Sequence, residues 1–449
     1  MAVNEFELLA DAEVRASAYL KAVNTRCVYP DEKAIEALSQ FEEALPQTGH
    51  GPTECLALLD DAGSPATVAS NGPRYFGYVV GASLPVAAAA DRLIATWDQS
   101  GDTPAAAVIE KIAARWVLDI LDLPGGSAVG FGTSATACGL SCIAAARRAL
   151  LKRQGWDLDE NGLVGAPRLK VVVSERIHVV VLKALRVLGF GKKDILTAPT
   201  NDYGAVDPAR LPPLDDKTIL CLQAGEVNTG EFDPFNEILP VAAAAGAWVH
   251  IDGAFGLWAR ATSKHKHLTA GIELADSWTT DGHKWLNTPY DCAMAICRDA
   301  DALAETMNSD AVYATASKDA QRNLTLEFSR KARGILIWAA LRSLGRSGVA
   351  SLIEGHISQA AKAAAALKKA GFTVLNRVVL NQVLIACEDD NVTRQVQAAV
   401  ERSGEAWFGL TRWNDRIAFR LSICSWRTTD KDISRLTDVI IKARDDARS

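Results

Sequence analysis

Short apolar segments that read as buried strands alternate with helical segments through the middle of this 449-residue chain. The segments LKVVVSE, TILCLQA, AWVHIDGA and CAMAICRD are apolar almost throughout, which is typical of strands covered on both faces. Before them, TPAAAVIEKIAARWVLDIL predicts a helix that is capped by Thr103 and has Pro104 in its first turn. This alternation predicts an α/β fold with a mainly parallel sheet and helices on both of its faces.

The pattern divides the chain into three parts. Residues 1–70 are helical and charged, with a break between Pro46 and Pro52, and predict an N-terminal helical arm. Residues 71–340 hold the alternating strands and helices and predict a large α/β domain. Residues 341–449 hold VLNQVLIACED and RIAFRLSICSW as strands between helices, which predicts a small C-terminal α+β domain.

Two charged residues mark a candidate active site. Lys284 follows His283 in DSWTTDGHKWLN, and Asp252 ends the apolar run of WVHIDGAFG. Because each follows a stretch of strand character, we expect both at the same end of one sheet. This arrangement suits pyridoxal phosphate: the amine forms a Schiff base, and the acid keeps the pyridine nitrogen protonated. The protonated ring then draws electrons from the substrate Cα.

The same cofactor needs an anion site for its phosphate, and GFGTSATACGL offers one. Small residues let backbone N–H groups approach a phosphate, hydroxyls add donors, and the positive end of the following helix favours an anion. A dinucleotide-binding loop is the alternative. That fingerprint requires a second strand that ends in an acidic residue about 20 residues later, and no such strand is expected at that distance in this chain.

With these motifs, the chain resembles the group II pyridoxal-phosphate-dependent amino acid decarboxylases of fold type I, which include aromatic amino acid and glutamate decarboxylases. The motifs that carry the resemblance occur in the family's order: GTSATA, SERIHVVVLKAL, AGEVNTGEFDP, VHIDGAFG, DGHKWLN and SRKARG. The resemblance extends from about Pro73 to Thr428. It implies a fold type I PLP-dependent transferase-like large domain and a homodimer with its active sites at the interface.

The resemblance also implies a role for individual positions around the cofactor ring. Lys284 matches the Schiff-base lysine, and Asp252 matches the partner of the pyridine nitrogen. Ala254 matches the small residue on one face of the ring, and His178 matches the imidazole that stacks on the other face. A flat imidazole gives dispersion contact and excludes water, although a histidine that only begins a helix is the alternative for His178.

Other positions match the surroundings of the ring. Ser134, Ala135 and Thr136 match the phosphate cradle, and His283 completes the pocket beside the lysine. Asn228 lies in the segment that approaches the phenolic oxygen of the cofactor. The resemblance therefore implies a cofactor site assembled from five separate motifs of the chain.

The reaction depends on which substrate bond is held perpendicular to the conjugated ring. Decarboxylation also needs a proton donor for the carbon that loses carbon dioxide. Tyr313, in DAVYATAS, lies where aromatic amino acid decarboxylases carry a mobile-loop tyrosine with this role, although an ordinary surface loop is the alternative. Aldol-type cleavage of a carbon-carbon bond and transamination use the same cofactor, and both stay open as alternatives to decarboxylation.

The side chain of the substrate is suggested by one segment. Phe76 and Tyr78, in PRYFGYVV, align with the segment that lines the substrate pocket in the relatives. Aromatic side chains there favour an aromatic amino acid through stacking and apolar burial. An acidic substrate would require an inward-facing Arg or Lys, and Arg74 is the cation that this segment contains.

Composition restricts the class of protein further. The net charge of −6 argues against a nucleic-acid surface, and no stretch is apolar enough over sufficient length to span a bilayer. Nine cysteines, an odd number without repeated spacing, suggest reduced thiols and a cytoplasmic location. The pairs Cys138/Cys142 and His265/His267 lack a second pair at zinc-ligand spacing, so no metal site is expected.

Overall fold

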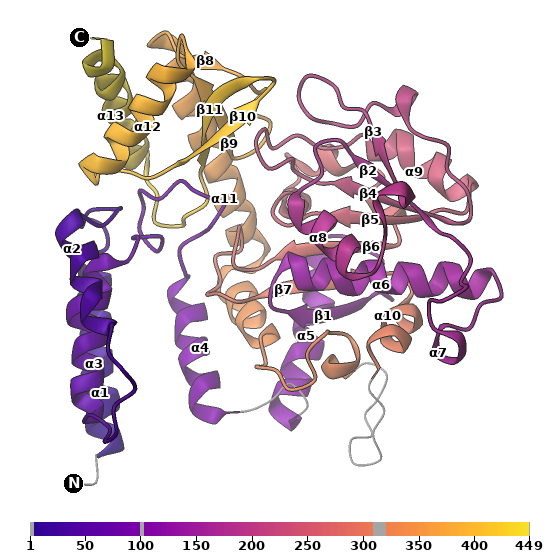
Figure 1. Cartoon of the computed structure of the whole chain (residues 1–449), viewed down its shortest axis with the longest axis horizontal. Helices are drawn as coiled ribbons and strands as arrows, with labels where there is room; N and C mark the ends of the chain where they lie inside the picture. Colours follow the sequence, from indigo (N-terminus) through magenta and orange to yellow (C-terminus); the bar gives the residue numbers. More distant parts are fainter. Residues whose placement is uncertain (1–3, 99–102, 309–319, 449) are drawn as a thin grey trace. The chain divides into compact units, whose positions relative to one another are not determined.

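The computed structural model of this chain describes residues 4–98, 103–308 and 320–448. The chain divides into two compact units, whose elements are labelled in Figure 1. The first unit comprises Met1–Ala82, Gln359–Leu375 and Val383–Ser449, and the second comprises Ser83–Ser358 and Asn376–Gln382. This division groups the N-terminal residues with the C-terminal ones, and the sequence-based division into an arm and two domains stays a prediction.

The second unit is built on a sheet with the strand order β1-β7-β6-β5-β4-β2-β3. Its strands are β1 (Ala128–Gly132), β2 (Lys170–Ser174), β3 (Ile195–Ala198), β4 (Thr218–Gln223), β5 (Trp248–Asp252), β6 (Ser277–Asp281) and β7 (Ala293–Cys297). Strands β2 to β6 run parallel, whereas β7 pairs antiparallel with β6 and β1. The predicted mainly parallel sheet is therefore confirmed, and strands β2 to β6 all end at one edge.

The helices of the second unit are α4 (Pro85–Trp97), α5 (Pro104–Ile120), α6 (Ala135–Arg153), α7 (Leu158–Asn161), α8 (Val179–Val187), α9 (Phe235–Ala244), α10 (Ala300–Met307) and α11 (Gly334–Lys369), which extends into the first unit. Of these, α5, α6, α9 and α10 pack against the strands. Every residue of β4, β5, β6 and β7 is buried, so the central strands are covered on both faces. The core between α6 and the sheet includes Ile143, Leu150, Val171 and Trp248.

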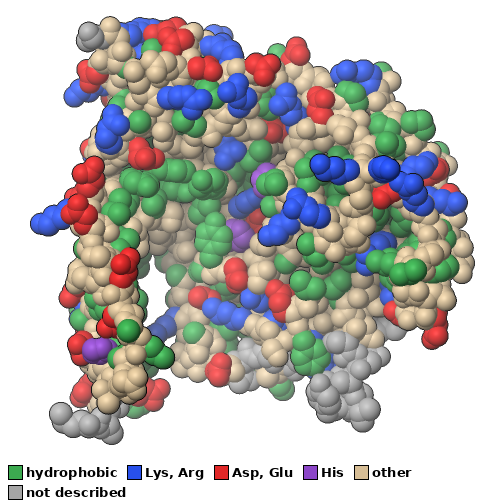
Figure 2. Space-filling view, in the orientation of Figure 1, with side chains coloured by type: hydrophobic (Ala, Val, Ile, Leu, Met, Phe, Trp, Pro, Cys, Tyr) green, Lys and Arg blue, Asp and Glu red, His purple; other side chains and the backbone are tan. Residues whose placement is uncertain are grey.

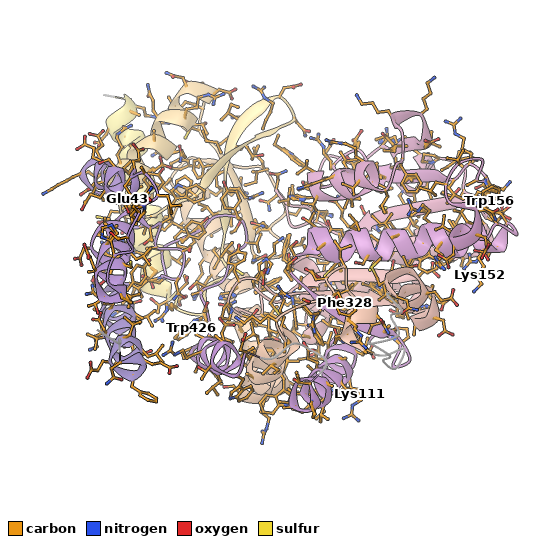
Figure 3. The ribbon with its side chains drawn as sticks, turned by 60° about the horizontal axis from the view of Figure 1, so that its bottom comes forward. Glu43, Lys111, Lys152, Trp156, Phe328 and Trp426 are labelled. Carbon is orange, nitrogen blue, oxygen red and sulfur yellow. The ribbon has the colours of Figure 1, made fainter. Side chains whose placement is uncertain are left out.

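Helix α6 packs against the central strands of the sheet and is labelled in Figure 1. Contacts with other segments fix its carboxyl end. Lys152 and Trp156 lie near that end in Figure 3. Lys152 Nζ pairs with Glu305 Oε2 of α10 at 3.0 Å, and Trp156 Nε1 donates to the Gly162 carbonyl at 2.9 Å. The positive charge of Lys152 in the last turn also interacts favourably with the negative end of the helix dipole. The positive end of the dipole lies at Ala135, where α6 begins.

Strand β1 is an edge strand whose free side is covered by a side chain. The Gln321 Oε1 accepts the Phe131 N–H at 2.8 Å, and the Gln321 Nε2 donates to the Val129 carbonyl at 2.9 Å. Close by, Arg330 makes a buried double hydrogen bond to Glu110, at 2.7 and 2.9 Å, and donates to the Phe131 carbonyl. These contacts fix β1, and therefore the loop that follows it.

The first unit combines a small sheet with helices. Its elements are α1 (Glu5–Ala22), α2 (Glu32–Glu36), α3 (Pro52–Leu58), β8 (Thr373–Val374), β9 (Gln382–Ala386, whose first residue falls in the second unit), α12 (Asp390–Ser403), β10 (Gly409–Trp413), β11 (Arg416–Ser422) and α13 (Asp430–Arg448). The strand order is β10-β11-β9-β8, with antiparallel pairs β10/β11 and β8/β9. This mixture of sheet and helix agrees with the α+β character predicted for the C-terminal part.

The N-terminal helices of the first unit lack a buried face. Within the described part of the chain, no residue of α1, α2 or α3 is buried. The side chain of Phe6 is 78% exposed and that of Leu45 is 92% exposed. Figure 2 shows apolar side chains in green among acidic ones in red along these helices. No helix among the described residues is both long and apolar enough to cross a membrane.

Candidate active site

Three neighbouring parallel strands of the second unit end in polar residues at the same edge. Gln223 ends β4, Asp252 ends β5 and Asp281 ends β6, each after a run of buried residues. Gln223 is in register with Asp252, and Asp252 with Thr279. The carboxyl edge of a parallel sheet is where α/β proteins place their ligands. This edge is therefore the candidate active site.

Asp252 lies at the centre of this edge. Its carboxylate is buried, and its Oδ1 accepts the Ala254 N–H at 3.1 Å. Burial raises the pKa of the Asp252 carboxyl, and the positive charges of His178 and Lys284 act in the opposite direction. The structure thus brings together four residues that the sequence singled out from three motifs.

Lys284 lies beside a second buried carboxylate. Its Nζ is 3.3 Å from the Asp281 Oδ2, and the lysine side chain keeps 21% of its surface exposed. The Asp281 Oδ1 accepts the Ala135 N–H at 2.7 Å. The backbone N–H of Asp281 donates to the Ala254 carbonyl at 2.9 Å. Asp281 therefore contacts Lys284, the start of α6 at Ala135, and the turn that follows Asp252.

His283 is buried next to Lys284. Its Nε2 is 3.8 Å from the Asp281 Oδ1, and its Nδ1 hydrogen bonds with the Cys292 carbonyl at 2.8 Å. The ring stacks on Tyr290 with 4.3 Å between the centroids. Burial lowers the pKa of His283, which favours a neutral imidazole beside the lysine.

The loop between β1 and α6 presents a helix N-terminus to this edge. Ser134 caps α6, and its side chain accepts the Ala137 N–H at 3.3 Å. Ala135 is buried, and the half-buried Thr136 follows it in the first turn. Backbone N–H groups at the start of a long helix form an anion site, as the sequence predicts for this loop.

His178 is the N-cap of α8, and Gln223 holds it in place. The His178 N–H donates to the Gln223 Oε1 at 3.1 Å, and the His178 Nδ1 accepts the Val180 N–H at 3.4 Å. The alternative of a helix-starting histidine thus describes part of what His178 does. Its charge nevertheless reaches Asp252, so it belongs to the same cluster.

Asn228 is engaged within its own turn. Its Nδ2 donates to the Glu226 Oε1 at 2.9 Å, and its backbone N–H donates to the Glu226 Oε2 at 2.8 Å. The same Glu226 carboxylate accepts the Thr229 N–H at 2.8 Å. These contacts organise the turn after β4, and the approach of Asn228 to the cofactor stays a prediction.

Three further predicted residues are not tested by the structure. Tyr313 lies outside the residues that the structure describes. Phe76 and Tyr78 belong to the first unit, where Phe76 is buried and the Tyr78 ring lies 5.5 Å from the ring of Trp407. Their role in a substrate pocket therefore stays a prediction.

Sequence reasoning missed Asp281 and Gln223. Asp281 had a signal, since it ends a strand three positions before Lys284 in DGHK and therefore faces the same edge. Gln223 had a weaker one, because a neutral amide at the end of TILCLQ resembles an ordinary turn residue. Only the strand register shows that Gln223 lies beside Asp252.

The residues at this edge fit pyridoxal phosphate. Lys284 offers a partly exposed amine, Asp252 a buried acid, and Ser134 and Thr136 offer hydroxyls at the N-terminus of α6. The Gln223 Nε2 is buried without a hydrogen-bond partner among the described residues, as expected of a donor that faces a bound molecule. In contrast, no group of three or more metal-binding side chains occurs within the described ranges.

Comparison with known proteins agrees with this geometry. The model of the pyridoxal-dependent decarboxylase conserved domain matches residues 67–386. Tryptophan decarboxylase 1 of Oryza sativa subsp. japonica is 28% identical over 378 residues, which cover 77% of this chain and 72% of the relative. L-2,4-diaminobutyrate decarboxylase of Rhizobium meliloti is 26% identical over 438 residues, which cover 91% and 85%.

Solved structures share the fold. The Oryza sativa TDC, solved with PLP and tryptamine, superposes with a TM-score of 0.91 at 22% identity, covering all of both chains. At this identity the likeness establishes the architecture of the chain. Fold type I with a mainly parallel sheet, as predicted, is thereby confirmed.

Proposed function

Since this chain belongs to the pyridoxal-dependent decarboxylase family, we propose that it decarboxylates an aromatic L-amino acid to the amine and carbon dioxide. The chain is a pyridoxal-phosphate-dependent carboxy-lyase, as its family and its decarboxylase relatives show. One observation carries the proposal at the level of residues. The Lys284 amine lies in a single cluster with a buried acid, Asp252, and a helix N-terminus at Ala135.

Each residue of the cluster has a separate task in this proposal. When bound, the cofactor supplies an electron-withdrawing ring that stabilises negative charge at the substrate Cα. Lys284 holds the cofactor covalently through its Nζ, and Asp252 holds the proton on the ring nitrogen. The segment Ser134, Ala135 and Thr136 would bind the phosphate at the start of α6 through the two hydroxyls and the helix dipole, while the Ala135 N–H donates to Asp281. Ala254 and His178 pack on the two faces of the ring and exclude water.

The preference for an aromatic substrate rests on two observations. Tryptophan decarboxylase 1 is among the relatives, and the segment with Phe76 and Tyr78 is aromatic. A diaminobutyrate decarboxylase is also among the relatives, so a cationic side chain is the competing substrate class. The two classes differ in the charge of the side chain, and a panel of amino acids separates them.

The test is a panel of L-amino acids with measurement of both carbon dioxide and amine. Tryptophan, tyrosine, phenylalanine, 2,4-diaminobutyrate and glutamate cover the aromatic, cationic and acidic classes. We expect equal amounts of amine and carbon dioxide from an aromatic substrate, and neither product from the Lys284→Ala variant. An aldehyde or keto acid in place of the amine would show a different reaction, such as aldol-type cleavage or transamination.

We further propose that Tyr313 donates the proton that completes the amine. The Tyr313→Phe variant keeps the ring and removes the phenolic proton. We expect its amine yield to fall by at least about tenfold, while binding of the cofactor is unchanged. Full amine yield from this variant would remove Tyr313 from the mechanism.

We also propose that the protein is a cytoplasmic homodimer with its active sites at the interface. The apolar side chains of Phe6 and Leu45 on the N-terminal segment are exposed, as expected of a surface that a second copy covers. All nine cysteines are free thiols, in keeping with a reducing compartment. Light scattering is expected to give twice the chain mass of 48.0 kDa, and a monomer would contradict the dimer.

A further inference from the structure

The last residue of β4, Gln223, carries a side-chain donor without a partner in the part of the chain that the structure describes. Gln223 is only 3% exposed, and its Nε2 has no hydrogen-bond partner within the described residues. Leaving a buried amide N–H unsatisfied costs about 1–3 kcal/mol. Such a group in a native structure needs an explanation, and a bound molecule is one.

The direction of this donor is fixed by the fold. The Gln223 Oε1 accepts the His178 N–H at 3.1 Å, so the oxygen of the amide faces His178 and the nitrogen faces away from it. Asp233 holds the backbone of Gln223 through two hydrogen bonds. The Gln223 N–H donates to the Asp233 Oδ2 at 2.7 Å, and the Asp233 N–H donates to the Gln223 carbonyl at 3.2 Å. The amide is therefore held in place before any ligand binds.

Strand register places this donor beside the acid of the site. Gln223 and Asp252 are paired residues of the parallel strands β4 and β5, so their side chains project from the same face, roughly 4.8 Å apart. Asp252 in turn senses the charges of His178 and Lys284. The Gln223 amide thus belongs to the residues that surround the cofactor in the proposed function.

We propose that Gln223 is a positioning residue that donates its Nε2–H to the phenolic oxygen of the cofactor ring. This inference rests on the proposed function and adds a residue to it. In the proposed function the ring N–H would donate to Asp252 and the phosphate would lie at the start of α6, which leaves the phenolic oxygen as the acceptor for the Gln223 donor. The Ala135 N–H reaches Asp281 on β6, which is two strands and roughly 10 Å from β4.

The residue that resemblance suggested for this role is engaged elsewhere. The Asn228 Nδ2 donates to the Glu226 Oε1 at 2.9 Å, inside the turn that follows β4. Gln223 precedes that turn, and the turn bends at Gly225, whose φ of +92° favours glycine. A Cβ at Gly225 would lie 2.9 Å from the Phe255 ring, so the path of the chain after Gln223 is tightly constrained.

The contact has a spectroscopic consequence. With the cofactor bound at Lys284, a donor hydrogen bond to its phenolic oxygen would withdraw negative charge from that oxygen. The bound cofactor would then lose its proton at a lower pH. Removal of the Gln223 donor is therefore expected to raise the pH midpoint of the visible absorption band of the bound cofactor.

Two variants of the holoenzyme distinguish the loss of the Nε2 donor of Gln223 from the loss of its Oε1 acceptor. Gln223→Met keeps the length of the side chain and removes both the donor and the acceptor. Gln223→Glu, measured at pH 8, keeps an oxygen for the His178 N–H and removes the donor. We expect both variants to bind pyridoxal phosphate about tenfold more weakly and to raise the pH midpoint of the band by about one unit.

A matched control lies in the first unit. Gln397 of α12 donates its Nε2 to the Phe408 carbonyl at 3.2 Å, and Gln397→Glu makes the same chemical change away from the candidate site. Its cofactor affinity and pH midpoint are expected to equal those of the wild type. Thermal unfolding of each cofactor-free variant shows how much of the fold survives.

The outcomes are distinct. Wild-type affinity and pH midpoint in Gln223→Met would overturn the inference, as would weak binding by Gln223→Met together with wild-type behaviour of Gln223→Glu. A variant that raises only the KM of the amino acid would assign the donor to the substrate carboxylate and would also overturn it. If the wild-type protein itself bound no pyridoxal phosphate, the proposed function would fail instead.

Discussion

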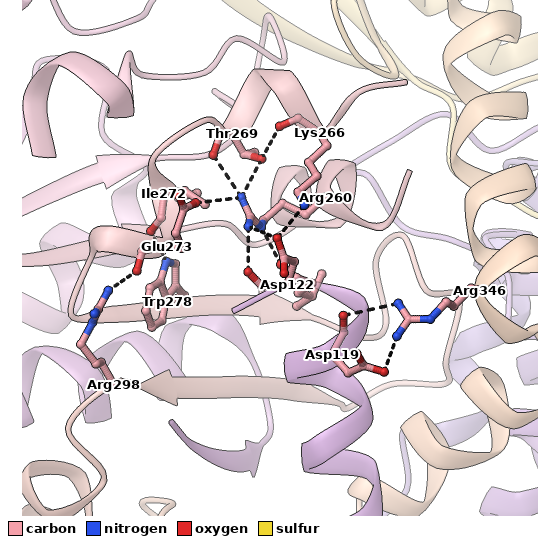
Figure 4. A network of polar contacts seen from close by, with 11 residues as sticks. Asp119, Asp122, Arg260, Lys266, Thr269, Ile272, Glu273, Trp278, Arg298 and Arg346 are labelled. Carbon is pink, nitrogen blue, oxygen red and sulfur yellow. Dashed lines mark hydrogen bonds and ion pairs between the residues drawn. The ribbon is translucent and has the colours of Figure 1, made fainter. Parts of the chain in front are cut away.

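Two buried polar clusters of the second unit differ in how completely their members are paired. The first, which we name the Arg260 cluster, is shown in Figure 4. The Arg260 guanidinium donates to the carbonyls of Leu121, Asp122 and Thr269 and also contacts the carboxylates of Asp122 and Glu273. Each of its three nitrogens has at least one acceptor, although Arg260 is only 5% exposed.

At the active-site edge, in contrast, the buried polar groups are less completely paired. Asp252 and Asp281 are both buried near the single amine of Lys284, and the Gln223 Nε2 has no partner among the described residues. Burial without full compensation raises the pKa of Asp252. The difference indicates that the Arg260 cluster stabilises the fold, whereas the site retains unpaired capacity for a ligand.

The largest expected effect sharpens this comparison on the structural side. Replacement of Arg260 by Met leaves the carbonyls of Leu121, Asp122 and Thr269 without their buried donor. Because each buried carbonyl left unsatisfied costs about 1–3 kcal/mol, we expect the free energy of unfolding to fall by about 3–5 kcal/mol, measured with urea on the cofactor-free protein. The folded fraction is expected to bind pyridoxal phosphate with wild-type affinity. A selective loss of cofactor binding would contradict the distinction between the two clusters.

Asp252→Asn tests the other side of the comparison. This change removes the acid that holds the ring nitrogen protonated, so we expect kcat/KM to fall by about 10²- to 10³-fold. The cofactor-free variant is expected to be at least as stable as the wild type, because a carboxylate that burial penalises is gone. Wild-type activity, or a large loss of stability, would show that Asp252 serves the fold.

A third expectation concerns Asp233, which accepts the N–H groups of Val206 and Gln223 at 2.8 and 2.7 Å. Burial raises the pKa of Asp233 to about 7 from an ordinary value of 3.8. The folded protein thus holds this proton more tightly than the unfolded chain, and stability falls as pH rises between these two values. We expect Asp233 to contribute a slope of up to about 1.4 kcal/mol per pH unit.

The measurement is urea unfolding of the cofactor-free wild type and of Asp233→Asn at several pH values. The difference between the two proteins should decrease as pH rises from about 4 to 7. The slope is the relevant quantity, because the asparagine also loses one of the two backbone contacts at every pH. A difference that does not change with pH would mean that Asp233 is ionised throughout.

The smallest effect is expected at an exposed pair near the Arg260 cluster. Arg346 contacts Asp119, and their side chains are 61% and 67% exposed. Because exposed pairs are screened by water and salt, Arg346→Met should change the free energy of unfolding by less than about 1 kcal/mol. This variant is the control for Arg260→Met, since it removes a guanidinium from the same unit. A loss as large as that of Arg260→Met would remove burial as the explanation.

Much of the fold was predictable because apolar runs that end in polar residues identify buried parallel strands. The same rule located Asp252 and Lys284, whose strand and loop lie at one edge of the sheet. Thr103 and Pro104 marked the start of α5 in the same way. These features depend on local pattern, which a sequence displays directly.

The remaining features depend on contacts between distant segments. The partner of Ala135 is Asp281, which is 146 residues away, and the partner of His178 is Gln223. Neither contact has a local signature. The grouping of N-terminal residues with the C-terminal part in one compact unit likewise follows from contacts that sequence spacing does not reveal.

The contact of Gln321 with β1 has a consequence for how the molecule avoids misassembly. A lone carboxamide bonds with Val129 and Phe131 as the backbone of an eighth strand would. It therefore occupies the open border of the sheet, where a strand of another molecule could otherwise be recruited. A shift of β1 by one residue would break both hydrogen bonds and turn its side chains to the opposite face of the sheet. The Gln321 amide therefore also fixes the register of β1.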